Sequence, residues 1–332
     1  MEKKEWTLPQ LLQLSDAYWA TCTLHAGVKL DVFTPLAAAP GLAGDLAGHL
    51  GCSERGMGML LDALAALGLL NKKDHLYSAT AFSAKYLSKR SSDYMGHIIM
   101  HHHHLVAGWG MLDQAVKTGR PVRQRSSHED EMESRESFLM GMFNLAMQIA
   151  PRIVPQIDLS GRRRLLDLGG GPGTYAIHFC LQNPELSAVI CDLPTTREFA
   201  EKTVAKFNLS GRIKFEAGDF EVQELPKGFD TAWLSHILHG VGPEICVEIL
   251  KKTMRALDPG GMIMVQEFIL DNDKDSPVFP ALFSLNMLVG TPEGQSYSEE
   301  ELMEMLKQAG AKEVRRIPLE LPNGAGVVAG IV

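Results

Sequence analysis

Apolar residues recur at helical spacing in the first part of the chain, and this spacing predicts a set of short helices. One helix is expected over residues 9–24 and a second over 42–50. Ser53 offers an N-cap for a third helix that runs to about residue 67. Residues 68–77 contain two short strand-like runs around a polar turn, which predicts a hairpin.

Helices followed by a strand pair are the order of a winged-helix fold, and its obvious function is DNA binding. The expected third helix, however, has Arg55 as its single basic residue and is otherwise largely apolar. A recognition helix needs side chains that reach phosphates and base edges. We therefore favour subunit association here, and a winged-helix regulator whose second domain senses a metabolite stays as an alternative.

Longer helical patterns connect this region to the rest of the chain. Apolar spacing predicts helical structure over residues 93–117 and again over 138–157. The polar residues 118–136 lie between them and include several arginines and acids. This composition predicts a mobile surface connection.

From residue 164 onward the pattern changes to strands that alternate with helices. Strands are expected at 164–168, 188–191, 213–216, 231–235 and 261–268. Such alternation is typical of a doubly wound parallel sheet. Two last strands, at 313–319 and 325–332, predict an antiparallel edge. The fold class is therefore α/β, a Rossmann-like and mostly parallel seven-stranded sheet with an antiparallel edge, plus an N-terminal helical winged-helix domain.

Composition excludes several classes of protein. The 332 residues are 45% hydrophobic, enough for a large core, and the net charge of −8 argues against broad nucleic-acid binding. No apolar run is long enough for a membrane span, and no secretory leader is evident. The five cysteines form no C-x-x-C pair, so a disulfide framework or thiolate zinc site is not expected. We expect a cytoplasmic protein.

A glycine-rich turn follows the first strand of the expected sheet and carries the most informative chemistry. Its glycines are Gly169, Gly171 and Gly173, whereas a nicotinamide dinucleotide site would need glycine at position 174, which is Thr. Asp167 stands two residues before the first glycine. A carboxylate there disfavours a pyrophosphate and suits a ligand that carries an ammonium or sulfonium group.

Two further acids follow the next two strands. Asp192, followed by Leu193, can accept hydrogen bonds from a ribose diol. After the third strand, Asp219 can accept from an exocyclic amine, and Phe220 can stack on a purine. Each feature alone is common in proteins. In this order, each after an expected strand, they predict S-adenosylmethionine as the cofactor.

The chain resembles the class I S-adenosylmethionine-dependent O-methyltransferases of the caffeate, hydroxyindole and bacterial polyketide type. The resemblance covers nearly the whole chain, and its motifs lie at residues 143–147, 167–173, 192–194, 218–220, 234–239, 257–261 and 265–267. It implies a homodimer that acts on a small molecule. It also implies a winged-helix-like dimerisation domain at 1–90, a helical connection at 91–160 that contributes to the substrate pocket, and a catalytic Rossmann-like domain at 161–332.

The resemblance also implies site residues. The cofactor-binding set is Asp167, Gly169, Gly171, Gly173, Asp192, Leu193, Gly218, Asp219, Phe220 and Ser235. The substrate-binding set is Phe143, Met147, Met287 and Thr291, with Phe283 among the apolar side chains around an aromatic ring.

For catalysis, the acceptor must be deprotonated while it attacks the methyl group. A phenol has a pKa of about 10 and an imidazole one of about 6.5, so a neutral histidine is a suitable base. His239 follows the fourth strand and matches the family's base, and Glu267 matches the acid that orients it. The alternative is a helix-capping or core histidine. We expect His236 to be packed or near the cofactor.

Two positions depart from the family. Gly240 stands where the family usually has Asp directly after the base, and Ser296 where plant members have a second acid. These departures keep a second hypothesis open, a relative on the same scaffold that performs C- or N-methylation or a non-methylating reaction.

Histidines also gather in the expected helix over 93–117. His97, His101 and His104 share one face of such a helix, a spacing that can ligate a metal. No carboxylate cluster accompanies them, so we expect no metal. The alternative is that they line the substrate cavity.

Overall fold

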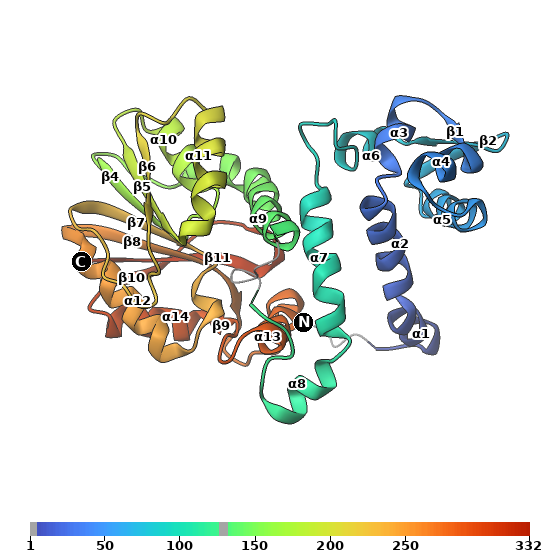
Figure 1. Ribbon diagram of the computed structural model, residues 1–332. Coiled ribbons are helices and arrows are strands. Elements are labelled where there is room, and N and C mark those ends of the chain that lie inside the picture. Colours follow the sequence, from blue (N-terminus) through green and yellow to red (C-terminus); the bar gives the residue numbers. More distant parts are fainter. Residues whose placement is uncertain (1–4, 126–131) are drawn as a thin grey trace. The chain divides into compact units, whose positions relative to one another are not determined.

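The computed structural model describes residues 5–125 and 132–332, which fold as two compact units that divide between Leu105 and Val106 (Figure 1). Each unit has its own buried core. In the described part of the chain, no helix combines the length and apolar character needed to cross a membrane. The three-part division expected from the sequence stays a prediction.

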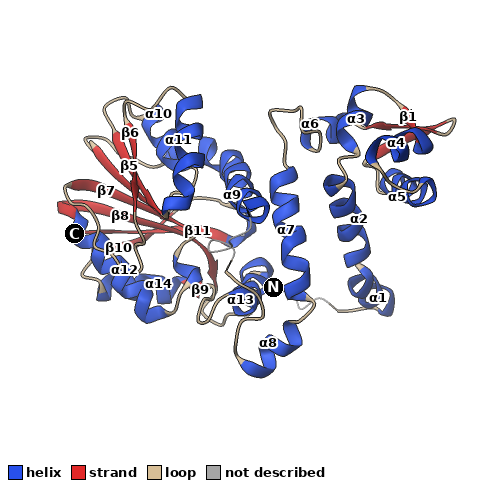
Figure 2. Cartoon of the chain, in the orientation of Figure 1, coloured by secondary structure: helices blue, strands red, loops and turns tan. Residues whose placement is uncertain are grey.

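The first unit is helical with one small sheet (Figure 2). Its elements are α1 (Leu8–Asp16), α2 (Tyr18–Lys29), α3 (Phe33–Ala38), β1 (Gly41–Leu42), α4 (Ala43–Leu50), α5 (Glu54–Ala66), β2 (Leu70–Lys73), β3 (Leu76–Ala79) and α6 (Ala81–Tyr86). The strands pair antiparallel in the order β1-β3-β2, so the expected hairpin is confirmed and gains a third strand. Phe33, Leu61 and Leu64 are fully buried at the centre of this unit.

Local hydrogen bonds decide the outcome for two of the helices expected in this unit. The Ser53 hydroxyl accepts a hydrogen bond from the N–H of Gly56, which confirms the expected cap of α5. The single helix expected over residues 9–24 was wrong. Ala17 keeps a helical backbone, but the following Thr21 N to Ala17 O hydrogen bond is stretched to 3.5 Å, and α1 and α2 are separate there.

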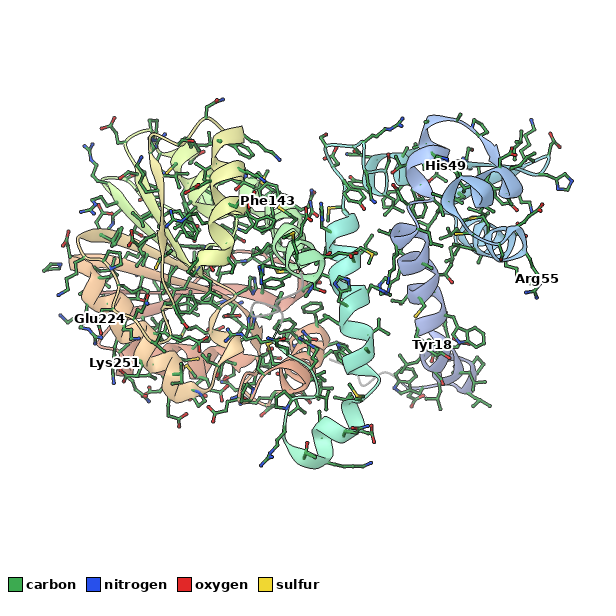
Figure 3. The ribbon with its side chains drawn as sticks, in the orientation of Figure 1. Tyr18, His49, Arg55, Phe143, Glu224 and Lys251 are labelled. Carbon is green, nitrogen blue, oxygen red and sulfur yellow. The ribbon has the colours of Figure 1, made fainter. Side chains whose placement is uncertain are left out.

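The outer face of α5 bears on the DNA-binding alternative. Helix α5 buries Met57, Leu61 and Leu64 and leaves Glu54, Arg55 and Asp62 exposed, with Arg55 labelled in Figure 3. Asp62 forms an ion pair with Lys72 of β2 and accepts from the Tyr77 hydroxyl. The exposed face therefore has more acids than bases, which is unsuitable for phosphate contacts.

Helix α7 (Gly96–Trp109) crosses the division, so that its last residues belong to the second unit. The others are α8 (Leu112–Thr118), α9 (Met132–Ile153), α10 (Thr174–Gln182), α11 (Arg197–Lys206), α12 (Pro243–Ala256), α13 (Val278–Gly290) and α14 (Glu299–Gln308), with short 3-10 turns η2 (Val154–Gln156), η3 (Pro194–Thr196), η4 (Leu238–Gly240) and η5 (Pro322–Gly324). The helix expected over 93–117 is interrupted between α7 and α8, at Gly110 and Met111.

The sheet of the second unit has the expected topology. Its strands are β4 (Arg164–Leu168), β5 (Ser187–Asp192), β6 (Ile213–Ala217), β7 (Phe229–Ser235), β8 (Leu257–Leu270), β10 (Lys312–Ile317) and β11 (Ala325–Ile331). They lie in the order β10-β11-β8-β7-β4-β5-β6, and a two-residue strand, β9 (Tyr297–Ser298), pairs with β8 as the eighth. The central pairs are parallel, and β11 is antiparallel to both β8 and β10. The seven expected strands and the antiparallel edge are therefore confirmed.

Apolar residues on both faces of this sheet bury it under helices. Trp233 of β7 is completely buried, and its ring meets Tyr175 and Phe179 of α10 at centroid distances of 5.0 and 5.2 Å. Because the parallel strands end at one edge of the sheet, the residues that follow them are brought together there. That edge carries the candidate site.

The mobile connection expected over 118–136 is contradicted in both of its described parts, and residues 126–131 lie outside the described residues. Residues 132–136 belong to helix α9. The backbone N–H groups of Val122 and Arg123 both donate to the carbonyl oxygen of Val289 in α13, at 2.9 and 3.2 Å. The Arg123 guanidinium contacts Asn286 of the same helix. Residues 122 and 123 are therefore held against α13 by backbone hydrogen bonds.

Candidate functional site

The turn between β4 and α10 has a backbone that requires glycine. Gly169, Gly171 and Gly173 have φ values of 63°, 53° and 83°. A Cβ on Gly169 would lie 2.4 Å from Cγ2 of Ile237 and 3.4 Å from Cε1 of Phe220, whereas one on Gly171 would meet no atom within 4 Å. The turn is therefore packed against residues 220 and 237 at one end and open at Gly171, where a ligand can approach the backbone.

Asp167 lies fully buried beneath this turn. One carboxylate oxygen accepts from the N–H of Ala176, which compensates for the missing side chain of Gly173 at the start of α10. The other oxygen, Oδ1, is buried and has no hydrogen-bond partner. Burial raises the pKa of Asp167 to about 7, and the charge of Asp192 acts in the same direction. A bound cation would supply both the missing donor and the missing charge.

Asp192 joins the end of β5 to the glycine turn. Its Oδ2 accepts from the N–H of Gly171 at 2.8 Å, and its Oδ1 accepts from the N–H of Leu193 at 2.7 Å and from the Thr196 hydroxyl at 3.2 Å. Burial raises the pKa of this carboxyl, and these hydrogen bonds oppose the shift. Thr196 was not expected from the sequence, because nothing in a Pro-Thr-Thr turn indicates an orienting hydroxyl.

The residues after β6 form the third part of this edge. Gly218 donates its N–H to the Asp192 carbonyl oxygen, and the Asp219 carboxylate accepts from the N–H of Glu221. Phe220 packs against the sheet's core cluster and, as described above, against the Gly169 turn. The structure thus brings Asp192 and the Phe220 ring to the glycine turn, whereas the hydrogen bonds of Asp219 are with Glu221 and Gln223 of its own segment.

Ser235, at the end of β7, is part of a polar group that the sequence did not reveal. Its hydroxyl lies 3.4 Å from Oε1 of Gln266, the neighbouring residue on β8. Burial raises the pKa of the nearby Tyr175 of α10 to about 12, and the Gln266 and Ser235 side chains oppose this shift. The signal was hidden because Gln266 and Tyr175 are isolated polar residues within apolar runs, and only the parallel register brings them together.

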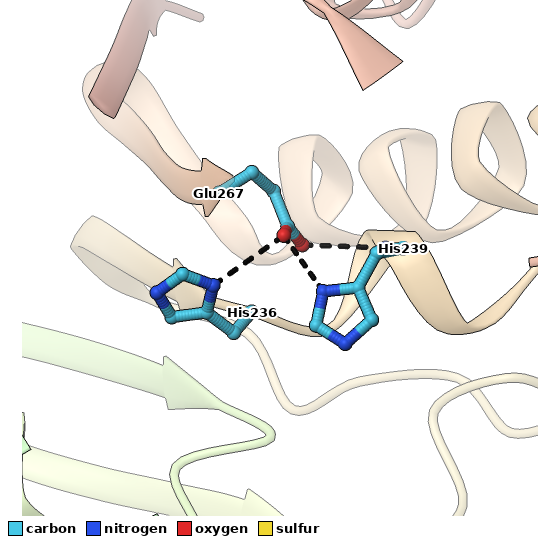
Figure 4. Close-up of side chains that lie close together, drawn as sticks. All are labelled: His236, His239 and Glu267. Carbon is cyan, nitrogen blue, oxygen red and sulfur yellow. Dashed lines mark hydrogen bonds and ion pairs between the residues drawn. The ribbon is translucent and has the colours of Figure 1, made fainter. Parts of the chain in front are cut away.

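A partly buried His239 and a buried Glu267 form a pair at this edge (Figure 4). The Nδ1 atom of His239, in the η4 turn, lies 2.7 Å from Oε2 of Glu267 on β8. The other oxygen, Oε1, accepts from the backbone N–H groups of Leu238 and His239 at 2.9 and 3.3 Å. The Glu267 side chain is 2% exposed, and the two histidines and their hydrogen bonds lower its pKa despite burial. An ionised Glu267 places the His239 proton on Nδ1 and leaves Nε2 as a base.

His236 approaches the same carboxylate from the other side. Its Nδ1 lies 3.5 Å from Oε2 of Glu267, and its ring packs at a tilt against Phe268 with centroids 4.3 Å apart. The sequence-based expectation was only that this residue is packed or near the cofactor. Its contact with Glu267 was not foreseen.

Aromatic rings cover the His239 imidazole. Phe283 of α13 meets it edge-on at 4.8 Å, and Phe268 and Phe279 pack onto Phe283. The expected lining residues lie on α9 and at the end of α13. Phe143, labelled in Figure 3, is half-buried on α9, and Met287 is 8% exposed on α13. No contact places either of them beside His239.

Two other expected lining residues are held by contacts within the fold. The sulfur of Met147 lies 3.4 Å from Nε2 of His178 on α10. The Thr291 hydroxyl donates to the carbonyl oxygen of Met287 and accepts from the N–H of Gly294. Asn144 was not among the expected site residues. Its side-chain oxygen is buried and has no hydrogen-bond partner.

The structure shows what surrounds Gly240 and Ser296, the two positions that depart from the family. A Cβ on Gly240 would lie 2.4 Å from Nη2 of Arg125, whose guanidinium forms an ion pair of 2.6 Å with Glu221. A cation therefore covers the position where the family usually has Asp. Ser296 is buried, and its hydroxyl donates to the Pro280 carbonyl oxygen.

Possible metal ligands coincide with this site. Across residues 5–125 and 132–332, one group of histidine and acidic side chains is compact enough for an ion, namely His236, His239 and Glu267, whose ligand atoms lie within 4.8 Å of one another. His97, His101 and His104 belong to no such group there.

Comparison with known proteins gives a consistent result. Family models described as the O-methyltransferase domain and the O-methyltransferase dimerisation domain match residues 110–312 and 12–89. The chain is 37% identical to 3-hydroxy-5-methyl-1-naphthoate 3-O-methyltransferase of Streptomyces sahachiroi, over 97% of this chain and 94% of that one. It is 29% identical to L-tyrosine C(3)-methyltransferase of Streptomyces lavendulae, over 86% and 82%. The solved structure of human N-acetylserotonin methyltransferase with SAM matches at a TM-score of 0.86 and 26% identity, over 100% and 99%.

Proposed function

Because the chain belongs to the S-adenosylmethionine-dependent O-methyltransferase family, we propose that it methylates a hydroxyl group of a small aromatic molecule, with His239 as the base. Two observations support the acceptor class. The Nε2 atom of His239 is left as a base by the Glu267 contact, and the Phe283 ring meets the imidazole edge-on. An aromatic acceptor can pack beside such a ring while its hydroxyl reaches Nε2.

The residues present fit the cofactor. The unpartnered Oδ1 of buried Asp167 suits an ammonium group, and the open side of Gly171 admits a ligand to the backbone. Asp192 suits a ribose diol, and Asp219 with Phe220 suits an adenine. Once bound, S-adenosylmethionine supplies a methyl group already activated by its sulfonium. The remaining cofactor residues proposed from the sequence are Gly169, Gly173, Leu193, Gly218 and Ser235.

The chain's own task is to align the acceptor and remove its proton. His239 would accept the acceptor's hydroxyl proton on Nε2, so that the oxygen could take the methyl group from the cofactor while the S–CH3 bond breaks and S-adenosylhomocysteine leaves. Glu267 stabilises the imidazolium that results, because its ionised carboxylate contacts Nδ1 and is itself held by two backbone N–H groups. The observation that carries this proposal is the 2.7 Å contact between His239 and Glu267.

A labelled methyl-transfer assay tests the function. The protein is incubated with S-adenosylmethionine carrying a labelled methyl group and a panel of phenols, catechols and hydroxylated polycyclic compounds. We expect transfer to at least one of them. Transfer to none would contradict the proposed acceptor class.

A His239→Ala variant tests the base. Loss of a general base lowers kcat by about 10²- to 10⁴-fold. We expect that loss together with unchanged binding of S-adenosylhomocysteine in calorimetry, because His239 is assigned to proton transfer alone. His75→Ala, at an exposed turn of the first unit, serves as the control. Near-wild-type turnover of His239→Ala would disprove the assignment.

Carbon methylation is a second candidate, favoured by the similarity to an L-tyrosine C(3)-methyltransferase. A phenolate can also react at its ring carbon, so the same base serves either outcome. NMR of the labelled product distinguishes them, because a methoxy carbon and a ring-methyl carbon resonate far apart.

We also propose a homodimer formed through the first unit. The match to a dimerisation domain supports it. So does α1, which buries none of its residues and leaves Leu8, Leu11, Leu12 and Leu14 more than half exposed.

A further inference from the structure

The residue directly after the proposed base is covered by an arginine from a distant part of the chain. A Cβ on buried Gly240 would lie 2.4 Å from Nη2 of Arg125, 3.0 Å from its Cζ and 3.4 Å from its Nε. The guanidinium therefore lies against the backbone of the η4 turn, which also carries His239. A positive charge stands where the family usually has a negative one, so the sign of the charge beside the base is reversed.

Two anchors hold Arg125 in this position. Two residues earlier, the backbone N–H of Arg123 donates to the carbonyl oxygen of Val289 in α13 at 3.2 Å. At the other end, Nη1 of Arg125 forms an ion pair of 2.6 Å with Oε1 of Glu221. The backbone carbonyl oxygen of Glu221 in turn accepts from the Lys252 ammonium at 3.0 Å. The guanidinium is thus preorganised, so a ligand that binds it immobilises few additional groups.

The ion pair leaves part of the guanidinium available to a ligand. Nε and Nη2 of an arginine form one edge of a planar group, and this edge matches the two oxygens of a carboxylate. Glu221 is bound through Nη1, and within residues 5–125 and 132–332 neither Nε nor Nη2 of Arg125 donates a hydrogen bond. The Arg125 and Glu221 side chains are 26% and 28% exposed. A ligand can therefore reach the guanidinium, while the surrounding protein excludes part of the solvent and strengthens a charged hydrogen bond.

Other acids near the η4 turn do not occupy this edge of the guanidinium. Glu267 is bound by His239 and by two backbone N–H groups. Glu293 lies over Gly242, where a Cβ would be 2.5 Å from its Oε2, and it is exposed, so water screens its charge. Glu221 remains as the neighbouring anion, and it holds Nη1.

We propose that Arg125 is a specificity-determining residue that binds a carboxylate of the acceptor, so that the substrates are aromatic hydroxy acids. The proposal rests on the proposed function, because it places the hydroxyl to be methylated at Nε2 of His239. Phe283 offers its ring to the aromatic part of the acceptor, and Arg125 lies over the residue next to the base. The Nε–Nη2 edge binds the carboxylate through two hydrogen bonds, a geometry that a lysine ammonium does not offer.

Binding of matched acids and amides tests the proposal. Calorimetry on protein loaded with S-adenosylhomocysteine compares hydroxy-substituted benzoic and naphthoic acids with their carboxamides, which keep the shape and lose the charge. We expect at least one acid to bind about 10- to 100-fold more tightly than its carboxamide, as is usual for charge-assisted hydrogen bonds. Equal dissociation constants in every pair would overturn the proposal.

Variants of the ion pair separate recognition of the acid from a structural role. Arg125→Gln should abolish the preference for the acid and leave the affinity for the carboxamide unchanged, and Arg125→Lys should retain part of the preference. Glu221→Gln removes the ion pair and keeps the cation, so the preference should persist. Arg120→Gln, at an exposed arginine of the same segment, is the matched control. A preference that survives in Arg125→Gln, or that is lost equally in Glu221→Gln, would contradict the assignment.

Because these measurements record binding alone, they keep the two proposals apart. An acid whose binding depends on Arg125 but which is not methylated contradicts the proposed function and leaves this inference standing. Methyl transfer to neutral phenols, together with equal affinities for the acids and their carboxamides, supports the proposed function and overturns this inference.

Discussion

At the scale of single residues, Asp167 shows how a ligand site can lower the stability of a fold. An ionised carboxylate without a partner for Oδ1 is costly in a fully buried position. Because the folded-state pKa is raised to about 7, the folded protein binds more protons than the unfolded chain between pH 4 and 7. The free energy of unfolding therefore falls as the pH rises through this range.

Asp167→Asn is expected to separate stability from cofactor binding. The amide can still accept from Ala176 but carries no charge, so the variant should be more stable than wild type at pH 8, by roughly 4 kcal/mol at most, and equal to it near pH 4. Binding of S-adenosylhomocysteine should weaken, because its ammonium loses its partner. Thermal unfolding at several pH values and calorimetry measure the two effects. Asp273→Asn, at an exposed carboxylate, is the control; wild-type cofactor affinity in Asp167→Asn would contradict the assignment.

At the scale of elements, the turn between β4 and α10 depends on one close contact. Gly169→Ala would place a Cβ 2.4 Å from Ile237 and force alanine into a φ of 63°. Both effects oppose folding, by about 1–3 kcal/mol, and the displaced turn should bind S-adenosylhomocysteine more weakly. Gly211→Ala is the matched control, because a Cβ there meets no atom within 4 Å and its φ is not positive. Equal melting temperatures and affinities for the two variants would contradict this account.

The elements also show what the sequence could and could not reveal. Strand β4 was predicted with its exact bounds, since its apolar run is ended by the glycines that follow. The pairing of His239 with Glu267 was anticipated only through the resemblance. The contacts of Gln266 with Ser235 and His236 were missed, because they depend on the parallel register of β7 and β8, which no local pattern encodes.

The contacts of Arg125 could not be predicted from the sequence either. It is one of several charged residues in a polar segment, and nothing near it in the sequence indicates Glu221 or Gly240 as partners. In the structure its guanidinium forms an ion pair with Glu221 and lies over Gly240. A polar segment was therefore identified correctly, but its contacts with residues about a hundred positions away were not.

At the scale of the whole molecule, the exposed apolar surface of α1 and α2 supports the proposed homodimer. Leu12 is 57% exposed and Trp19 is 63% exposed, and both lie within the region matched by the dimerisation domain. A stable dimer needs about 1,200 Å² or more of buried surface, and its core is usually apolar and aromatic. A lysine at either position would have to lose its hydration in such an interface.

Leu12→Lys and Trp19→Lys are therefore expected to shift the protein from dimer to monomer in light scattering coupled to gel filtration. Both positions are exposed within the chain, so the far-UV circular dichroism and the cofactor affinity of the second unit should change little. Val116→Lys, at a valine of α8 that is 61% exposed, is the matched control and should remain dimeric. If both α1–α2 variants stay dimeric at micromolar concentration, the subunits associate through another surface, and the apolar face of α1 must serve a different partner.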